Sequence, residues 1–253
     1  MCQIIFKETM QFGAGYDKIE KTGNENDRIR KAWIFMKAGI IFDMDGTLWD
    51  SAENVAKSWN EAIVKSGLLK KELTTADIQG VMGKTMDVIA DILFPELAKE
   101  ARMSLLDACC QEENDYLREH GGILYPGVAE TLAELKKQYG LYIVSNCQKG
   151  YIEAFLDHYK LWDYFSDIEC YGNNLLQKGE NIRLLATRNG LKKAVYVGDI
   201  QADYEAAKQA GAGFIHAGYG FGTIDDTVPE LRTFEELLAL NQRGTIEGAM
   251  REL

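Results

Sequence analysis

The sequence predicts an α/β protein, a doubly wound parallel sheet with a block of helices inserted after its first strand. Three observations support this fold class. The apolar run at 40–42 is typical of a strand that is covered on both faces. Residues 51–120 then show helical periodicity without a strand signal. Beyond residue 128 strand and helix patterns alternate, which predicts βαβ units with right-handed crossovers.

Length and charge limit the kinds of partner. The chain has 253 residues, of which 46% are hydrophobic, enough to bury a sizeable core. Its formal net charge of -11 argues against nucleic acid or an anionic membrane surface, because either needs a basic face and no Lys/Arg cluster is visible. No apolar run approaches the ~18 residues that a membrane-spanning helix needs. We therefore expect no nucleic-acid and no membrane partner.

Cysteine usage and the start of the chain favour the cytoplasm. The five cysteines form neither a Cys-x-x-Cys pair nor a zinc-finger spacing, so we expect reduced thiols. The first residues lack the basic end and apolar stretch of a signal peptide. Cys147 lies near the candidate site described below and is interpreted as a small buried filler.

Residues 1–35 read differently from the rest of the chain. They lack a helix or strand period, and we expect them to be poorly ordered. Met36 stands directly before the first strand, which suggests that translation starts there and that the leader is an artefact of gene assignment. A genuine flexible arm is the alternative. An intact mass of the native protein that included the leader would refute the first hypothesis.

Residues 51–120 are interpreted as a helical unit. Apolar side chains recur on one side of its first helix, at Val55, Trp59, Ala62 and Ile63. Further helices are expected at 75–80, 85–94 and 98–120. Trp59 is interpreted as part of the core of this unit rather than as a stacking platform.

Residues 36–50 and 121–253 are interpreted as the sheet domain. After the turn at Pro126, the expected elements are helix 128–139, strand 141–144, helix 152–159, strand 168–171, helix 178–189, strand 194–197, helix 201–210, strand 213–216 and helix 234–240. Ligands of such sheets bind beyond the carboxyl ends of the strands. The polar residues at those ends are therefore the candidates for a functional site.

Two carboxylates end the first strand. Asp43 and Asp45 follow the apolar run, and because side chains alternate along a strand they are expected to point the same way. Like charges held together repel each other, and burial adds to the cost unless a cation lies between them. A divalent metal is the natural partner of this pair.

Polar residues also follow two later strands. Ser145 and Asn146 come after strand 141–144, and Asp199 and Asp203 come after strand 194–197. Between them, Lys178 begins a helix. Each feature alone is commonly structural, because a serine at a strand end is often a cap and Gly-Asp is often a turn.

Taken in order, these pieces resemble the motifs of the haloacid dehalogenase superfamily of phosphohydrolases. The set is Asp43-Met44-Asp45-Gly46-Thr47, then Ser145, Lys178, and Gly198-Asp199 with Asp203. Many relatives have proline after the lysine, where this chain has Gly179, so Lys149 and Lys160 remain weaker alternatives to Lys178. The helical unit resembles the α-helical cap of the phosphoglycolate phosphatase-like members.

The resemblance implies a two-step phosphoryl transfer. Asp43 would attack phosphorus and form an aspartyl-phosphate. Asp45 would give a proton to the leaving oxygen and later take one from the attacking water. The expected metal is Mg²⁺, because the ligands on offer are hard oxygens, namely the carboxylates of Asp43 and Asp199 and the backbone carbonyl of Asp45.

The remaining motif residues are expected to surround the phosphoryl group. The groups expected to hold its oxygens are Gly46, Thr47, Ser145, Asn146 and Lys178. Asp203 is expected to orient water or Lys178 from the second layer of the site.

Three functions remain under consideration. The leading one is a magnesium-dependent phosphatase for a small phosphorylated metabolite, resembling phosphoglycolate phosphatases, as a monomer or homodimer. A β-phosphoglucomutase-like phosphotransferase is the alternative, and a non-enzymatic scaffold that retains the fold is the alternative of another class. Hydrolytic dehalogenation is disfavoured, because dehalogenases of the superfamily typically lack the second aspartate, here Asp45.

Other motifs receive structural interpretations. The Gly218–Gly222 run does not have the spacing of a dinucleotide loop and is interpreted as a flexible surface turn. The three histidines are scattered and are interpreted as fillers rather than metal ligands. Asp-x-Asp-Gly also begins calcium loops, but no glutamate closes a twelve-residue loop here.

Overall fold

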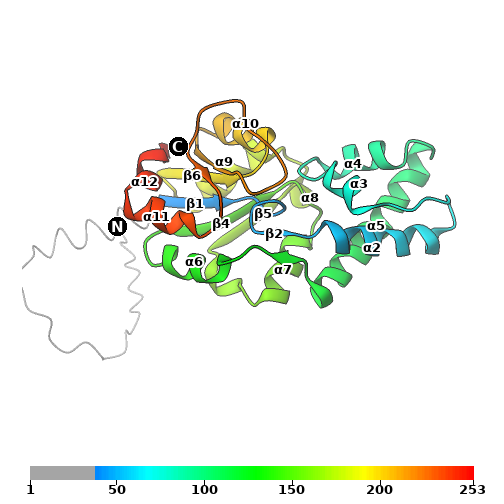
Figure 1. The fold of residues 1–253 in the computed structure, drawn as a ribbon. Helices are drawn as coiled ribbons and strands as arrows, with labels where there is room; N and C mark the ends of the chain where they lie inside the picture. Colours follow the sequence, from blue (N-terminus) through cyan, green and yellow to red (C-terminus); the bar gives the residue numbers. More distant parts are fainter. Residues whose placement is uncertain (1–37) are drawn as a thin grey trace, which may run out of the picture.

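The computed structural model describes residues 38–253. The expectations for residues 1–35 and for Met36 lie outside this range. Within it the chain forms a seven-stranded sheet with helices on both faces, and a group of helices projects from one end (Figure 1). The predicted fold class is confirmed. The proposed domain limits at residues 50 and 121 stay a prediction.

The first strand lies in the middle of the main sheet. The strand order is β5-β4-β1-β6-β7-β8, all parallel, and β9 pairs antiparallel with the start of β6. The bounds are β1 Ala38–Phe42, β4 Gly140–Ser145, β5 Asp167–Cys170, β6 Lys193–Gly198, β7 Gly213–Ala217, β8 Glu230–Leu231 and β9 Arg251–Glu252. The carboxyl ends of β4, β1 and β6 therefore lie side by side, which is where the candidate residues fall.

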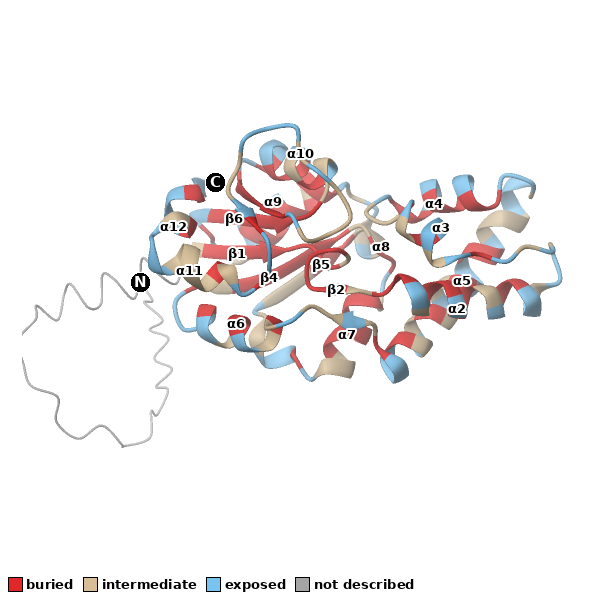
Figure 2. Cartoon of the chain, viewed as in Figure 1, coloured by how far each residue is buried: buried red, intermediate tan, exposed pale blue. Residues whose placement is uncertain are grey.

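The two faces of β1 are both covered, as its apolar sequence predicts. Ile40 and Phe42 face a core built with α6 and α7, whereas Ile41 faces a second core built with α9 and α10. Figure 2 shows the buried residues concentrated along β1, β4 and β6. The helices of the sheet region are α6 Val128–Leu135, α7 Tyr151–Tyr159, the 3₁₀ turn η1 Trp162–Tyr164, α8 Tyr171–Asn174, α9 Lys178–Arg188, α10 Gln201–Ala210, α11 Glu236–Gln242 and α12 Thr245–Ala249.

The four helices between β2 and β3 form the projecting group, called the cap below. They are α2 Ala52–Ser66, α3 Thr75–Gln79, α4 Met86–Leu93 and α5 Lys99–His120. The interior of the cap is apolar, and the Trp59 ring is buried and stacked on Phe94 with ring centres 6.0 Å apart. Trp59 is thus part of the cap core, as the sequence suggests. No helix within residues 38–253 combines the length and apolarity needed to cross a bilayer.

Two short strands connect the cap to the sheet. The chain enters the cap through β2, Trp49–Asp50, and returns through β3, Ile123–Leu124, and the two pair antiparallel. Trp49 anchors this pair, because its buried ring packs against Phe155 of α7 with ring centres 5.0 Å apart. Sequence periodicity does not reveal β2 and β3, because two residues are too few to show a period.

Candidate active site

Three carboxylates meet at the carboxyl edge of the sheet. Asp43 follows β1, Asp199 follows the neighbouring strand β6, and Asp203 lies in the first turn of α10. One carboxylate oxygen from each lies within 4.8 Å of the others, and all three residues are buried. Parallel pairing of β1 with β6 brings the first two together although they are far apart in sequence.

Lys178 lies among these carboxylates. Its Nζ atom donates to Oδ1 of Asp43 at 2.9 Å and to Oδ1 of Asp203 at 2.6 Å. The amine is buried and is positioned by the first turn of α9. Lys149 and Lys160, the two alternatives, are exposed. Lys178 is therefore the lysine that the fold brings to the first aspartate.

The cluster carries more negative charge than its lysine balances. Burial raises the pKa of Asp43 to about 7, with repulsion from Asp203 adding to the effect and Lys178 opposing it. Burial also raises the pKa of Asp199 to about 8, again with repulsion from Asp203 and Asp43. For Lys178 burial favours the neutral amine, but the two carboxylates outweigh it and its pKa is raised. An added cation would relieve this excess charge.

The surroundings of Asp199 fit a metal ligand. Its Oδ2 atom accepts a hydrogen bond from the backbone N–H of Phe221 at 2.8 Å. Two glycines leave space around its carboxylate: a Cβ atom on Gly46, which has φ +80°, would lie 2.1 Å from Oδ2, and one on Gly220 would lie 2.4 Å from the Asp199 Cβ atom. Three oxygen donors within reach of one another in such a cradle suit a hard divalent ion.

The glycine run at 218–222 has a role beyond the one expected. The sequence predicts a flexible surface turn, and in the structure Gly220 also packs against Asp199 while the backbone N–H of Phe221 donates a hydrogen bond to the Asp199 carboxylate. Tyr219 also donates to the backbone carbonyl of Thr47 at 2.7 Å. The segment is a turn with exposed and half-exposed residues, as expected, and its glycine at 220 also allows the close approach of two backbones beside Asp199.

Asp45 is not part of the three-carboxylate cluster and has partners different from those of Asp43, and strand alternation does not relate the two side chains because β1 ends at Phe42. Its Oδ1 atom accepts hydrogen bonds from Tyr151 OH at 2.6 Å and from Ser51 Oγ at 2.7 Å. Burial raises the pKa of Asp45 to about 6, and the hydrogen bonds from Tyr151 and Ser51 act in the opposite direction. A carboxyl group with a pKa near neutrality can both give and accept a proton at physiological pH.

The phosphate-side candidates lie around the same edge. Ser145 ends β4, the neighbour of β1 on the side opposite β6, and it is buried. The Asn146 amide reaches the cap, where its Nδ2 atom donates to the carbonyl of Gly83 at 2.9 Å. Thr47 Oγ1 is buried and has no hydrogen-bond partner within residues 38–253. These groups remain proposed phosphate ligands.

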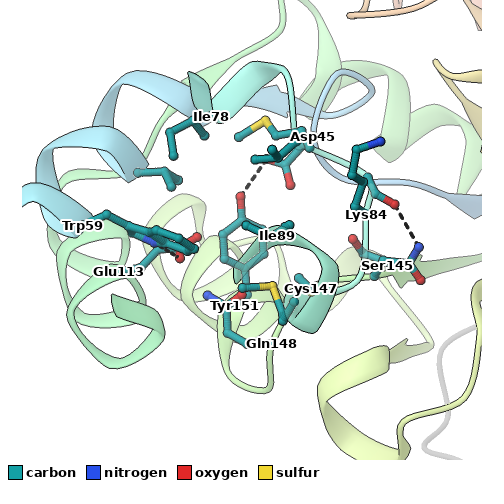
Figure 3. A pocket seen from close by; sticks show the side chains of 16 residues that line it. Asp45, Trp59, Ile78, Lys84, Ile89, Glu113, Ser145, Cys147, Gln148 and Tyr151 are labelled. Atoms are coloured by element: carbon teal, nitrogen blue, oxygen red, sulfur yellow. Dashed lines mark hydrogen bonds between the residues drawn. The ribbon is translucent and has the colours of Figure 1, made fainter. Parts of the chain in front are cut away.

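A pocket lies between the cap and this edge of the sheet (Figure 3). Asp45, Ser145 and Tyr151 from the sheet region line it together with Trp59, Ile89 and Glu113 from the cap. Its cavity volume is about 50 Å³. Cys147 also lines it, and burial raises the pKa of its thiol well above the ordinary value, which suits an inert filler.

Sequence reasoning missed three residues of the site. Ser51 and Tyr151 hold Asp45, and Glu113 lies in the pocket wall. Ser51 follows the linker, Tyr151 begins α7 and Glu113 is in the middle of α5. Of the three, only Glu113 could have been suspected from the sequence pattern. It is an acidic side chain on the buried side of α5, where acidic residues are rare.

Fold and site together define a class, the α/β enzymes that carry a charged cluster at the carboxyl edge of a parallel sheet beneath a helical cap. Within this class, the family model of haloacid dehalogenase-like hydrolases matches residues 40–217, and the chain belongs to this family. It is thus a hydrolase, and its curated relatives make it a phosphatase.

Two of these relatives are phosphoglycolate phosphatases. The one from Aliivibrio fischeri is 30% identical over 223 residues, which cover 79% of this chain and 95% of the relative. The one from Rhodobacter capsulatus is 29% identical, covering 84% of this chain and 98% of the relative.

Solved structures share the fold. A haloacid dehalogenase-like family protein from Streptococcus pneumoniae superposes with a TM-score of 0.66 at 21% identity, covering 82% of this chain and 99% of that one. Mutant CbbY from Rhodobacter sphaeroides in complex with xylulose-(1,5)bisphosphate gives a TM-score of 0.66 at 22% identity, covering 79% and 95%.

Proposed function

We propose that the protein is a magnesium-dependent phosphatase that hydrolyses a small phosphorylated metabolite through an aspartyl-phosphate on Asp43. The observation that carries the proposal is the separation of two carboxyl groups from one strand end. Asp43 is held by Lys178 at 2.9 Å, whereas Asp45 is held by Tyr151 at 2.6 Å. These different partners support attack by Asp43 and proton transfer by Asp45.

In the first step Asp43 attacks phosphorus and the bond from phosphorus to the leaving oxygen breaks. The ion pair with Lys178 favours the ionised, nucleophilic form of Asp43 against the effect of burial. Asp45 enters this step protonated and gives its proton to the leaving oxygen, so that an alcohol departs rather than an alkoxide.

In the second step water replaces Asp43 on phosphorus. Asp45, now a carboxylate, takes a proton from the water as its oxygen attacks, and the bond between phosphorus and Asp43 breaks. Inorganic phosphate leaves, and both aspartates return to their starting states. Ser51 and Tyr151 keep the Asp45 carboxyl in one orientation through both transfers.

The metal site would use the carboxylates of Asp43 and Asp199 with the backbone carbonyl of Asp45. When bound, Mg²⁺ would supply positive charge that neutralises phosphoryl oxygens and carboxylates. Asp203 would act from behind, because its Oδ1 atom accepts from Lys178 and its Oδ2 atom accepts from the backbone N–H of Asp199 at 3.1 Å. Asp203 would therefore position both Lys178 and Asp199, which lie beside Asp43.

The phosphoryl oxygens would be held by neutral donors and by Lys178. The proposed donors are the Ser145 hydroxyl, the Thr47 hydroxyl, the Lys178 amine and the backbone N–H groups around Gly46 and Asn146. Such donors offset the charge that develops in the transition state. The buried Thr47 hydroxyl supports this assignment, because a ligand oxygen would satisfy it.

The metabolite and its setting are also part of the proposal. The names of the relatives make phosphoglycolate the first compound to test. We infer the cytoplasm as the location, supported by four free cysteines within residues 38–253. A monomer or homodimer remains the expected assembly.

The test measures phosphate release from p-nitrophenyl phosphate with and without Mg²⁺. We expect turnover that depends on Mg²⁺ and is lost in Asp43→Asn, while the exposed Asp107→Asn on α5 keeps the wild-type rate. Acid-quenched wild type should carry the mass of one added phosphoryl group, which Asp43→Asn lacks. Equal background rates in wild type and Asp43→Asn would favour a scaffold. Conversion of β-glucose 1-phosphate to the 6-phosphate with little free phosphate would favour the phosphotransferase.

A further inference from the structure

The cap contributes a buried acid to the pocket. Glu113 on α5 is 4% exposed and lines the same cavity as Asp45. Its Oε2 atom accepts a hydrogen bond from Nε1 of Trp59 at 2.6 Å. Figure 3 shows Glu113 beside Trp59, at the other end of the pocket from Ser145. The part of a substrate farthest from its phosphate would therefore reach Glu113.

No basic side chain within residues 38–253 forms an ion pair with Glu113. Burial accordingly raises the pKa of Glu113 to about 8, against the hydrogen bonds from Trp59 and Gln148. A buried acid without a cation is costly for a fold unless something compensates it. In a binding pocket the compensating group can come from the ligand.

The rest of the cap wall is apolar. It consists of Val55, Ile78, Val81, Met82, Met86 and Ile89. The cavity volume of about 50 Å³ compares with the ~10–15 Å³ that one water needs on the same measure, so only a few non-hydrogen atoms fit beyond the phosphate. A short leaving group with carbon along its length and one polar end matches these walls.

We propose that Glu113 selects phosphate monoesters of short alcohols that carry a hydrogen-bond donor, a hydroxyl or a protonated amine, at the end opposite the phosphate. This inference rests on the proposed phosphatase function and narrows its substrate class. A carboxylate at that end offers no hydrogen to the Glu113 oxygens and opposes the ionisation of Glu113, whereas an ammonium group favours it. Lys84 is the basic residue of the lining, and it is exposed. Phosphoglycolate is therefore a poor substrate despite the names of the relatives.

A matched series of two-carbon phosphates tests the proposal. The compounds are phosphoethanolamine, 2-hydroxyethyl phosphate, ethyl phosphate and phosphoglycolate, which differ at the distal end. We expect kcat/KM to be ~10-fold or more higher for the first two than for phosphoglycolate, with ethyl phosphate below the hydroxyl compound. Faster turnover of phosphoethanolamine than of 2-hydroxyethyl phosphate would show that Glu113 prefers a charged donor. The reverse order would show that it prefers a neutral donor.

Glu113→Gln removes the ability to ionise beside an ammonium group and keeps an oxygen for Trp59 and for a hydroxyl. The ratio of kcat/KM for phosphoethanolamine to that for phosphoglycolate should fall ~10-fold or more, while the ratio for the hydroxyl compound changes less. Glu112→Gln is the matched control, because Glu112 pairs with Lys65 at 2.7 Å and does not line the pocket. Its substrate ratios should equal those of wild type.

The outcomes separate this inference from the proposed function. If the two-carbon phosphates are hydrolysed in an Asp43-dependent way but phosphoglycolate is the best of the four, the selection by Glu113 is overturned and the phosphatase stands. Unchanged ratios in Glu113→Gln overturn it as well. Loss of phosphoglycolate turnover in Lys84→Ala would show that the exposed lysine selects instead. If p-nitrophenyl phosphate and all four compounds are inert, both proposals fall.

Discussion

The hydroxyl of Tyr151 donates a 2.6 Å hydrogen bond to Oδ1 of Asp45, from a helix that follows β4 rather than β1. Ser51 donates to the same oxygen at 2.7 Å and lies 2.7 Å from the Tyr151 hydroxyl. The proposed proton donor is thus fixed by two residues outside the family motifs. Its orientation, as well as its pKa, depends on them.

Tyr151→Phe should slow the proton transfer. We expect kcat to fall ~10-fold, because the carboxyl of Asp45 loses one of two groups that orient it. The loss should be larger for an alkyl phosphate than for p-nitrophenyl phosphate, whose leaving group is stable without a proton. Steady-state kinetics on both substrates check this, with Ser51→Ala expected to show the same pattern. Equal losses on the two substrates would contradict a role in protonation.

Lys178→Met should destabilise the protein as well as inactivate it. The substitution leaves Asp43 and Asp203 buried without their shared cation. Breaking a buried ion pair from one side costs roughly 3–5 kcal/mol. Urea unfolding at pH 8 measures the change, and Lys160→Met, at an exposed position, serves as the control. A free energy of unfolding of Lys178→Met within about 1 kcal/mol of wild type would contradict this account of the cluster.

Gly220→Ala should weaken the metal site. A Cβ atom there would lie 2.4 Å from the Cβ atom of Asp199, so the carboxylate or the loop must shift. We expect a higher Mg²⁺ concentration for half-maximal activity, by ~10-fold or more, because a displaced ligand loses coordination geometry. In α12, Gly248→Ala meets nothing within 4 Å and should leave this concentration unchanged. A normal Mg²⁺ dependence in Gly220→Ala would refute the role of the loop.

Stability should depend on pH through Glu113. Its pKa is raised from the ordinary 4.5 to about 8 by burial, so between these values the folded protein holds a proton that the unfolded chain releases. The contribution of this group to stability is therefore complete below about pH 4.5 and is lost as pH rises toward 8. Because glutamine does not titrate, Glu113→Gln should abolish this pH-dependent loss of stability.

The measurement for Glu113 is thermal or urea unfolding of both proteins at pH 5 and pH 9. We expect the stability of Glu113→Gln relative to wild type to increase between the two pH values, on the order of a few kcal/mol. Glu112→Gln should show no such trend, because Glu112 is only partly buried and paired with Lys65. A relative stability that does not change with pH would mean that Glu113 is not buried as an unpaired acid.

Much of the fold could be predicted from periodicity. The apolar run before Asp43 and the alternation after residue 128 indicate a parallel sheet, and the carboxyl ends of such strands meet at one edge. That rule alone brings Asp43, Ser145 and Asp199 together. The rule does not identify the lysine. The family motif favours Lys178 over Lys149 and Lys160, and the structure shows its contact with Asp43.

The rest of the site depends on packing between segments that periodicity does not relate. Ser51 and Tyr151 are 100 residues apart in sequence and meet only because β2 packs against α7. Glu113 has a regular place in a long helix, and only the position of the cap reveals that it enters the pocket. The sequence predicts the turn at 218–222 but not its contact with Asp199, which lies at the end of another strand.

The paired linkers β2 and β3 have a consequence for the order of events in a catalytic cycle. Ser51, which directly follows β2, is both the entrance to the cap and a hydrogen-bond donor to Asp45. Any rotation of the cap about these linkers changes the bonding of the acid at the same moment. If the cap turns as a substrate enters, the hydrogen bond from Ser51 to Asp45 is therefore one that the movement would alter.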